Sequence, residues 1–434
     1  MAKNNTIWTK GHKLERFDII PVDQGGDFLN MIGQYGFIKY YEDVIDPAVH
    51  VEITCVDTNG FLNKLPIRSG YPVNLKLTHP SQDEALEYDI KGEPLVITNI
   101  SNHLADNKRE MYTLTCETKH AISNQTTRVW EKHTGSIEST VRDILEKKLQ
   151  VKSDRIKKID STKNNYEFYG NYRRPFKVIS DMCPKAIPPS VSGDSPESGS
   201  SGFLFFETQD GWNFRSIDAI FREGQKNKKK LPKYDMTAYK DAFDIKNNFM
   251  IAAEPVWDES HDILKKLRSG AYKTANWYYD VLSRKVHFHT YQYEKSVDKN
   301  MEKANEEEVI PSDFTQSYSR IILSTLDHGT TTPDSSGSDT LTPQDQARYQ
   351  AQASARYAAM FSQTLDITVP MNISLRAGDM INVEFPEINT EKPFRGRNSE
   401  SGLYMIARLS HEFGNPDGDF TGLSLVRDTF QSNK

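Results

Sequence analysis

The sequence predicts a mainly β protein with α+β insertions, in which two similar small antiparallel β-barrels lie toward the two ends of the chain. Three observations predict this class: apolar and polar residues alternate near both ends, helical periodicity is confined to a few segments, and one short pattern occurs twice. At 434 residues the chain exceeds the usual size of a single core. We expect a barrel domain over 1–120, an inserted α+β region over 121–315, and a helix plus a second barrel over 316–434.

The N-terminal domain is predicted from period-2 alternation. Between Val49 and Cys55 every second residue is apolar and the residues between them are polar, which is typical of a strand with one buried face. Residues 73–77 and 112–116 follow the same rule, and the stretch after Leu95 is β-branched. These segments predict an antiparallel barrel that ends near residue 120.

The middle of the chain combines helices with aromatic hairpins. Apolar residues at helical spacing predict a helix over 136–149, and Pro175 is suited to the first position of another. Residues 203–216 read as a hairpin around a tight turn, and residues 276–293 as a second hairpin turning at Ser283-Arg284. Between these hairpins, Asp258 is a candidate N-cap for a helix that carries Ile263. This alternation predicts the inserted α+β region.

The C-terminal region begins with a long connection rich in Ser, Thr, Gly and Asp at 327–341. Thr342 and Pro343 then provide an N-cap and a first residue for a helix that runs to about Phe361. From Leu365 to Phe430 the alternation of strands returns. These features predict the helix and the second barrel.

An internal repeat connects the two barrels. Residues 67–75 and 375–383 share the form apolar-Arg-small-Gly-x-x-apolar-Asn-apolar at an offset of 308, and two later matches, at 100 and 409 and at 114 and 423, follow at 309. Gly70 and Gly378 are expected at turns that need a positive φ. The alternative is that any two β-rich segments look alike. A homotrimer of such chains would present six similar modules around one axis, a pseudo-sixfold ring.

Composition excludes several classes of protein. The formal net charge of −6 does not favour binding of nucleic acid to the whole chain. Cys55, Cys116 and Cys183 are too few and too scattered for a disulfide framework or a zinc pair, which favours folding in a reducing cytoplasm. No stretch approaches the length of apolar sequence that spans a bilayer, so we expect no membrane anchor.

Motifs of catalysis and metal binding are weak. His287 and His289 share one face of a predicted strand, a geometry that zinc could use, but no third ligand is implied. Gly193-Asp194-Ser195 lies in a Ser/Gly/Pro loop rather than at a nucleophile elbow, and the glutamates at 306–308 form a charge run. Neither a phosphate-binding loop nor a dinucleotide motif is present. We therefore expect no enzyme and no catalytic, metal or cofactor residue.

Two groups of residues are candidates for contacts with partner proteins. Lys226, Lys228, Lys229 and Lys230 form a basic run that could contact an acidic partner surface, although the sequence favours a plain exposed loop. The predicted helix at 343–361 carries the other candidates, Tyr349 and Tyr357, which suit packing on a sheet or on a neighbouring subunit.

The C-terminal strands carry a family resemblance. Leu375-Arg376-Ala377-Gly378-Asp379, Ser401-Gly402-x-Tyr404-x-Ile406, His411 and the stretch 421–428 resemble the closing barrel of tail hub proteins. The hairpin 203–216 resembles the mid-chain signature of the contractile phage baseplate hub in its T-even-type branch, which is related to the hub part of type VI secretion spikes.

The resemblance implies a structural role in a virion. It implies a trimeric torus that adapts the sixfold tail tube, or a tube-initiator protein, to a trimeric cell-puncturing spike, with baseplate wedge proteins around it and DNA passing through its centre. Three copies at −6 each would carry −18, which suits a channel in which DNA slides without adhering. The chain would be made in the cytoplasm of the host bacterium. Two alternatives are a tail-associated peptidoglycan hydrolase and a module that binds host glycans through the hairpin 276–293.

Overall fold

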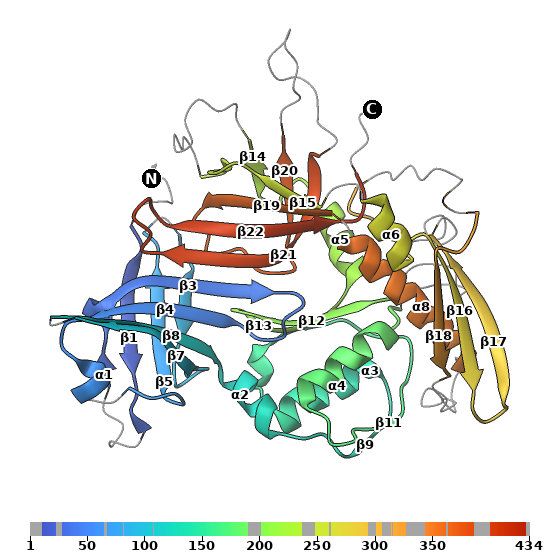
Figure 1. Ribbon diagram of the computed structural model, residues 1–434, viewed down its shortest axis with the longest axis horizontal. Helices are drawn as coiled ribbons and strands as arrows, with labels where there is room; N and C mark the ends of the chain where they lie inside the picture. Colours follow the sequence, from blue (N-terminus) through green and yellow to red (C-terminus); the bar gives the residue numbers. More distant parts are fainter. Residues whose placement is uncertain are drawn as a thin grey trace, which may run out of the picture.

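One sheet of 14 strands forms the largest part of the molecule (Figure 1). The computed structural model of the chain describes residues 11–22, 28–64, 67–80, 82–106, 108–189, 201–236, 248–259, 262–293, 301–305, 314, 316–326, 343–361, 363–385 and 400–430. Along the sheet the strands are, in spatial order, β15 (Val256–Glu259), β19 (Gln363–Pro370), β22 (Phe420–Arg427), β21 (Gly402–Phe413), β3 (Tyr35–Asp43), β4 (His50–Asp57), β8 (Glu110–Thr118), β7 (Leu95–Ala105), β5 (Pro72–Thr78), β1 (Lys13–Ile19) and β2 (Leu29–Asn30). At its sides, β6 (Ala85–Tyr88) pairs with β5, and β20 (Met380–Glu384) pairs with β21 and with β14 (Lys233–Asp235). The prediction of a mainly β fold is confirmed.

The strands of the two ends of the chain do not close into two separate barrels, which corrects the architecture expected from the sequence. The reason is the length of β21. Residues Gly402–Met405 of β21 pair with β20, whereas Arg408–Phe413 pair with β3 from the first half of the chain. Because β21 pairs with strands from both halves of the chain, the strands of the two halves form one open sheet in the described part of the chain.

Four strands in each half nevertheless share one connectivity. In space the first four strands lie in the order β4-β8-β7-β5, and the second four lie in the order β19-β22-β21-β20. The strands β4, β5, β7 and β8 therefore correspond, in this order, to β19, β20, β21 and β22. Ile100 faces Leu114 across β7 and β8, and Leu409 faces Leu423 across β21 and β22, as the repeat requires. Both hairpins also carry a β-bulge at the equivalent place. The internal repeat is therefore confirmed. We call β3, β4, β5, β7 and β8 the first β module, and β15, β19, β20, β21 and β22 the second β module.

Each β module packs one face on its own apolar core. Along β4, Val51, Ile53 and Cys55 are fully buried while the residues between them face the other side, as alternation predicts. The core of the first β module also receives Ile373 and Phe413 from the second half of the chain. The two modules therefore share apolar contacts as well as strand pairs.

The helices over residues 119–182 of the inserted region lie below the sheet in Figure 1, and the region contains the predicted helices and the first predicted hairpin. Its helices are α2 (Lys119–Thr126), α3 (Ile137–Asp143), which continues as a π-helical turn over Ile144–Lys148, α4 (Pro175–Met182) and α5 (Ile217–Lys226). Its strands are β9 (Lys132–His133), β10 (Ile156–Ile159), β11 (Phe168–Tyr169), β12 (Phe203–Thr208) and β13 (Gly211–Ser216). The hairpin of β12 and β13 is buried, and the rings of Phe205 and Trp212 stack across it at 5.3 Å.

A small three-stranded sheet lies at the right of Figure 1, beside the C-terminal helix. It contains β16 (Lys273–Asp280), β17 (Lys285–Gln292) and β18 (Arg320–Thr325); the helices nearby are α6 (Ile263–Ser269) and α8 (Pro343–Met360), while α1 (Phe61–Lys64) lies at the far side. The second predicted hairpin and the predicted helix from Pro343 are confirmed. Asp262 rather than Asp258 caps α6, because its carboxylate accepts a hydrogen bond from the Lys265 amide at 2.9 Å. In the described residues, no helix has both the length and the apolar character needed to cross a membrane.

Candidate functional site

A groove of about 630 Å³ crosses the polar face of the large sheet, opposite the apolar cores. Strand alternation creates this face, since the residues that do not point into a core must point here. Tyr41 and Asp43 reach it from β3, and Asp366 and Thr368 reach it from β19. The groove therefore spans both β modules at the place where they join.

The groove is acidic. Five carboxylates line it, together with one guanidinium, that of Arg408, and the imidazole of His50. These carboxylates belong to Asp43, Asp46, Glu52, Glu254 and Asp366; Glu42 also borders the groove, but its carboxylate is buried and accepts hydrogen bonds from Tyr40, Gln209 and Ala377. Arg408 pairs with Asp43 at 2.9 Å, so most of the acids have no basic partner within the groove. Such a surface repels phosphate groups.

Two strand edges of the β modules lie open. In the described part of the chain, β7 pairs with β5 only at Leu95 and Val96, so its outer side has no neighbouring strand over 98–105. On the other module, β15 pairs with β19 alone. Exposed apolar side chains lie at both edges: Leu104 is 62% exposed and Val256 is 53% exposed. Open edges with apolar residues favour the addition of another strand.

The predicted partner contacts differ in exposure. Lys226, at the end of α5, and the three lysines that follow it are exposed, which both a partner surface and a plain exposed loop predict. Tyr349 is instead buried beside Ile187. The hydroxyl of Tyr357 bonds with the backbone of Phe203, donating to its carbonyl at 2.5 Å and accepting from its amide at 3.0 Å. Both tyrosines therefore make contacts within one chain, and their contact with a partner stays a prediction.

The structure places the remaining candidate motifs as follows. His287 and His289 both lie on β17, opposite Tyr278 and Asn276 of β16. Within the residues that the structure describes, no third ligand completes a metal cluster with them. Gly193-Asp194-Ser195 and the glutamate run at 306–308 lie outside the described residues.

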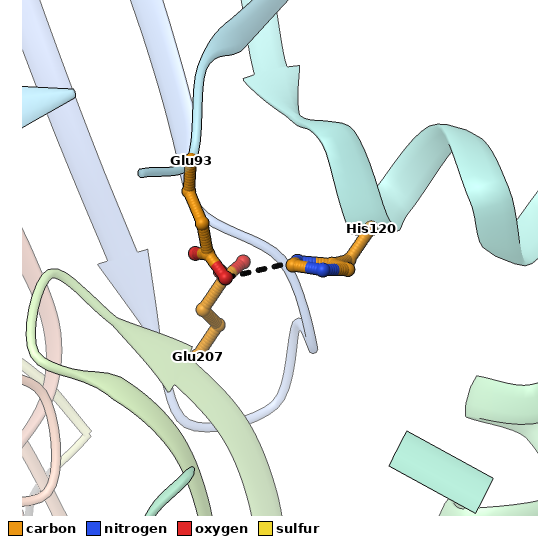
Figure 2. A group of neighbouring side chains, drawn as sticks. All are labelled: Glu93, His120 and Glu207. Atoms are coloured by element: carbon orange, nitrogen blue, oxygen red, sulfur yellow. Dashed lines mark ion pairs between the residues drawn. The ribbon is translucent and has the colours of Figure 1, made fainter. Parts of the chain in front are cut away.

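One cluster that the sequence did not predict lies in the interior (Figure 2). Glu93 comes from the loop before β7, His120 from the first turn of α2, and Glu207 from β12. One potential ligand atom of each lies within 4.8 Å of the others. The three residues are far apart in the sequence, and the only signal there is a glutamate in the otherwise apolar stretch 203–207.

Burial dominates the electrostatics of this cluster. Removal from water, and then the nearby charge of Glu93, raise the pKa of Glu207 to about 8. Burial lowers the pKa of His120, which keeps its imidazole neutral. Glu93 forms an ion pair with Arg155, whose Nε lies 2.8 Å from Oε2. At neutral pH the cluster thus combines the Glu93 carboxylate, which is paired with one guanidinium, with a Glu207 carboxyl group that is largely protonated and a neutral imidazole.

Solved structures with a similar fold are tail proteins. A tail protein from Neisseria meningitidis matches at a TM-score of 0.55 and 10% identity, covering 96% of this chain and 97% of its own. A 43 kDa prophage tail protein from Shewanella oneidensis matches at 0.53 and 10% identity, covering 97% and 100%. A component of the E. coli type VI secretion system is more distant, at 0.43 and 9% identity, covering 96% and 77%.

No family model matches the sequence, and no curated protein matches it either. The first two structures show that this chain has the fold of those tail proteins over nearly its whole length.

Proposed function

We propose that this chain is the structural hub of a contractile phage tail baseplate, acting as a ring-shaped homotrimer without catalytic activity. The observation that carries the proposal is the pair of open strand edges on two β modules of the same connectivity. The fold that this chain shares with two tail proteins supports a place in a phage tail.

The junction within one chain indicates how copies would join. There, β21 of the second β module pairs with β3, the outer strand of the first β module. By the shared connectivity, β7 is the equivalent of β21, and β4 is the equivalent of β19. Since β3 pairs with β4 and β15 pairs with β19, β15 is the equivalent of β3. Repeating the junction between copies therefore pairs β7 of one copy with β15 of the next. Such a head-to-tail contact closes into a ring when its rotation permits.

Side-chain exposure supports the same seam. At the repeat offset of 309, Met111 corresponds to Phe420, and the second bulge of β7 places Leu104, opposite Met111, at the position of Glu412, opposite Phe420. Phe420 is 7% exposed, whereas Met111 is 38% and Leu104 62% exposed. The first β module thus leaves uncovered, at its open edge, an apolar pair whose counterpart on β22 is buried in the second β module. A neighbouring copy would bury Leu104 and Met111 in the same way.

The acidic groove fits a ring with a central channel. It lies on the polar face of the continuous sheet and is lined in part by Glu254 and Val256, next to the proposed seam. In a ring whose polar face points inward, this surface would border the channel and repel the DNA backbone. The ring would adapt the tail tube above to a trimeric spike below, within a virion. The exposed lysines at 226–230 offer a contact for an acidic wedge, tube or spike surface.

Assembly mass tests the proposal. Light scattering should give three times the 49.6 kDa chain for the protein alone, or for the protein co-expressed with its neighbouring spike-like gene product, in which case three spike chains are added. A monomer in both preparations would contradict the hub function. Activity in a cell-wall zymogram would instead support the hydrolase, and binding to host surface glycans would support the attachment module.

A further inference from the structure

The Glu93–His120–Glu207 cluster contains three buried polar atoms that face one another without a hydrogen-bond partner. They are Oε1 of Glu93, Nδ1 of His120 and Oε1 of Glu207. The residues are 7%, 5% and 1% exposed, and Nδ1 of His120 lies 3.5 Å from Oε1 of Glu93. A buried polar group without a partner costs about 1–3 kcal/mol. Three such atoms directed at one point are explained by a species that contacts all of them.

The other oxygen of each carboxylate is already held by the protein. Oε2 of Glu93 accepts a hydrogen bond from Nε of Arg155 at 2.8 Å. Oε2 of Glu207 accepts one from Oγ1 of Thr118 at 2.8 Å, and a longer one from the Val49 amide at 3.4 Å. These donors orient the carboxylates so that only the inner oxygens remain available. Metal ligands in proteins are oriented by such outer hydrogen bonds.

The donor set indicates which cation would fit. One imidazole nitrogen with two carboxylate oxygens suits Zn²⁺ or a similar first-row divalent cation, whereas Ca²⁺ and Mg²⁺ prefer oxygen ligands alone. We propose that Glu93, His120 and Glu207 form a structural binding site for one divalent transition-metal cation.

The site would join parts of the chain that are distant in sequence. Glu93 belongs to the loop that enters β7, His120 to α2 directly after β8, and Glu207 to the buried hairpin of the inserted region. A cation held by all three would fasten the inserted region to the first β module. The role is separate from oligomer formation, because all three ligands belong to one chain and are buried within it.

Metal content and affinity of the full chain test the proposal. The protein is produced with zinc in the medium and its metal content measured, then stripped with a chelator and titrated with ZnCl₂ and with MgCl₂. We expect one zinc per chain, no comparable binding of magnesium, and a rise in the unfolding temperature with zinc. Absence of zinc in both experiments, or equal binding of magnesium, would overturn the site.

Three variants and one control make the test specific. H120A and E207Q should lose zinc binding, and Thr118→Val should weaken it about 10- to 100-fold, because Thr118 only orients a ligand. The control is His50→Ala, since His50 also lies near two glutamates, Glu52 and Glu117, but on the surface. It should bind zinc like the natural chain.

Folding of the variants is checked without metal. E207Q resembles the protonated form of Glu207, whose pKa burial raises to about 8, and should unfold, after chelation, no more easily than the stripped natural chain. If the folded E207Q and H120A proteins bind zinc as tightly as the natural chain, the proposal is wrong. This result would leave the hub function untouched, because assembly mass is measured separately.

Discussion

Gly70 and Gly378 occupy the same turn in the two β modules. The amide of Gly70 donates to the carbonyl of Ile97 at 2.7 Å, and that of Gly378 donates to the carbonyl of Ile406 at 2.8 Å. Both glycines have positive φ angles, +95° and +84°. Two turns that repeat the same hydrogen bond at the ends of the chain show that the modules share local geometry as well as strand order.

The two glycines should respond differently to alanine. A Cβ at Gly70 meets nothing within 4 Å, so Gly70→Ala should cost only the strain of a positive φ, about 1 kcal/mol. A Cβ at Gly378 would lie 2.6 Å from Cζ of the buried Phe206, so overpacking should add about 1–3 kcal/mol. Urea unfolding of both variants measures the difference. Equal midpoints would show that the Phe206 ring moves aside without loss of stability.

The proposed seam predicts that charge at either edge prevents assembly. Leu104→Lys on β7 and Val256→Lys on β15 should each yield a folded monomer, because a charged residue at an edge opposes strand addition. The matched control is Leu282→Lys, which is exposed at the tip of the β16–β17 hairpin and should keep the mass of the natural chain. Light scattering and circular dichroism together provide the test. A trimer that tolerates both edge lysines would place the seam elsewhere.

Arg356 joins α8 to the end of β22 through a buried ion pair. Its guanidinium lies 2.5 Å from Asp428 and 3.3 Å from Asp218, and its side chain is 0% exposed. Arg356→Met should destabilise the protein by about 3–5 kcal/mol, because two buried carboxylates lose their counter-charge.

Thermal and urea unfolding measure this loss against a surface pair. The control is Arg142→Met, since Arg142 is 49% exposed and lies 3.8 Å from Glu146. It should change stability by about 0.5 kcal/mol or less. A loss for Arg356→Met as small as this would mean that the buried carboxylates are neutral in the folded chain.

Glu42 predicts a loss of stability with rising pH. Burial raises its pKa from 4.5 to about 7, although Arg376 and three hydrogen bonds act in the opposite direction. Between these pH values the folded chain binds more protons than the unfolded chain. The stability from this group is therefore fully present below pH 4.5 and is lost as the pH rises through about 7. At about 1.4 kcal/mol per pKa unit, the loss is on the order of 3 kcal/mol.

Unfolding midpoints on either side of this pH window provide the measurement. Glu42→Gln stays neutral and should flatten the dependence of the midpoint on pH. Glu87→Gln is the control, because Glu87 is exposed on β6 and should leave the dependence unchanged. A slope that is the same in the natural chain and in Glu42→Gln would show that Glu42 is not its source.

Local signals predicted most of the elements. Alternation identified β4, and an apolar pair of segments around Gln209-Asp210-Gly211 identified the hairpin of β12 and β13. The cap of α6 was misplaced from Asp262 to Asp258, because both are acidic residues before the same apolar stripe. A helical stripe does not reveal whether its own chain or a partner covers it, so the tyrosines of α8 were predicted to pack either on a sheet or on a neighbouring subunit.

The sequence by itself determined the repeat, since Gly70 and Gly378, with the alternation after them, encode the same turn and strand at both ends of the chain. It did not determine how the two modules meet. That depended on β21, whose second half pairs with β3 and so joins two expected barrels into one open sheet. The acidic groove and the cluster of Glu93, His120 and Glu207 likewise arise only from the tertiary structure. The physical reason is that periodicity reports the face a residue occupies, whereas pairing and clustering depend on long-range contacts between segments that carry no local mark of their partner.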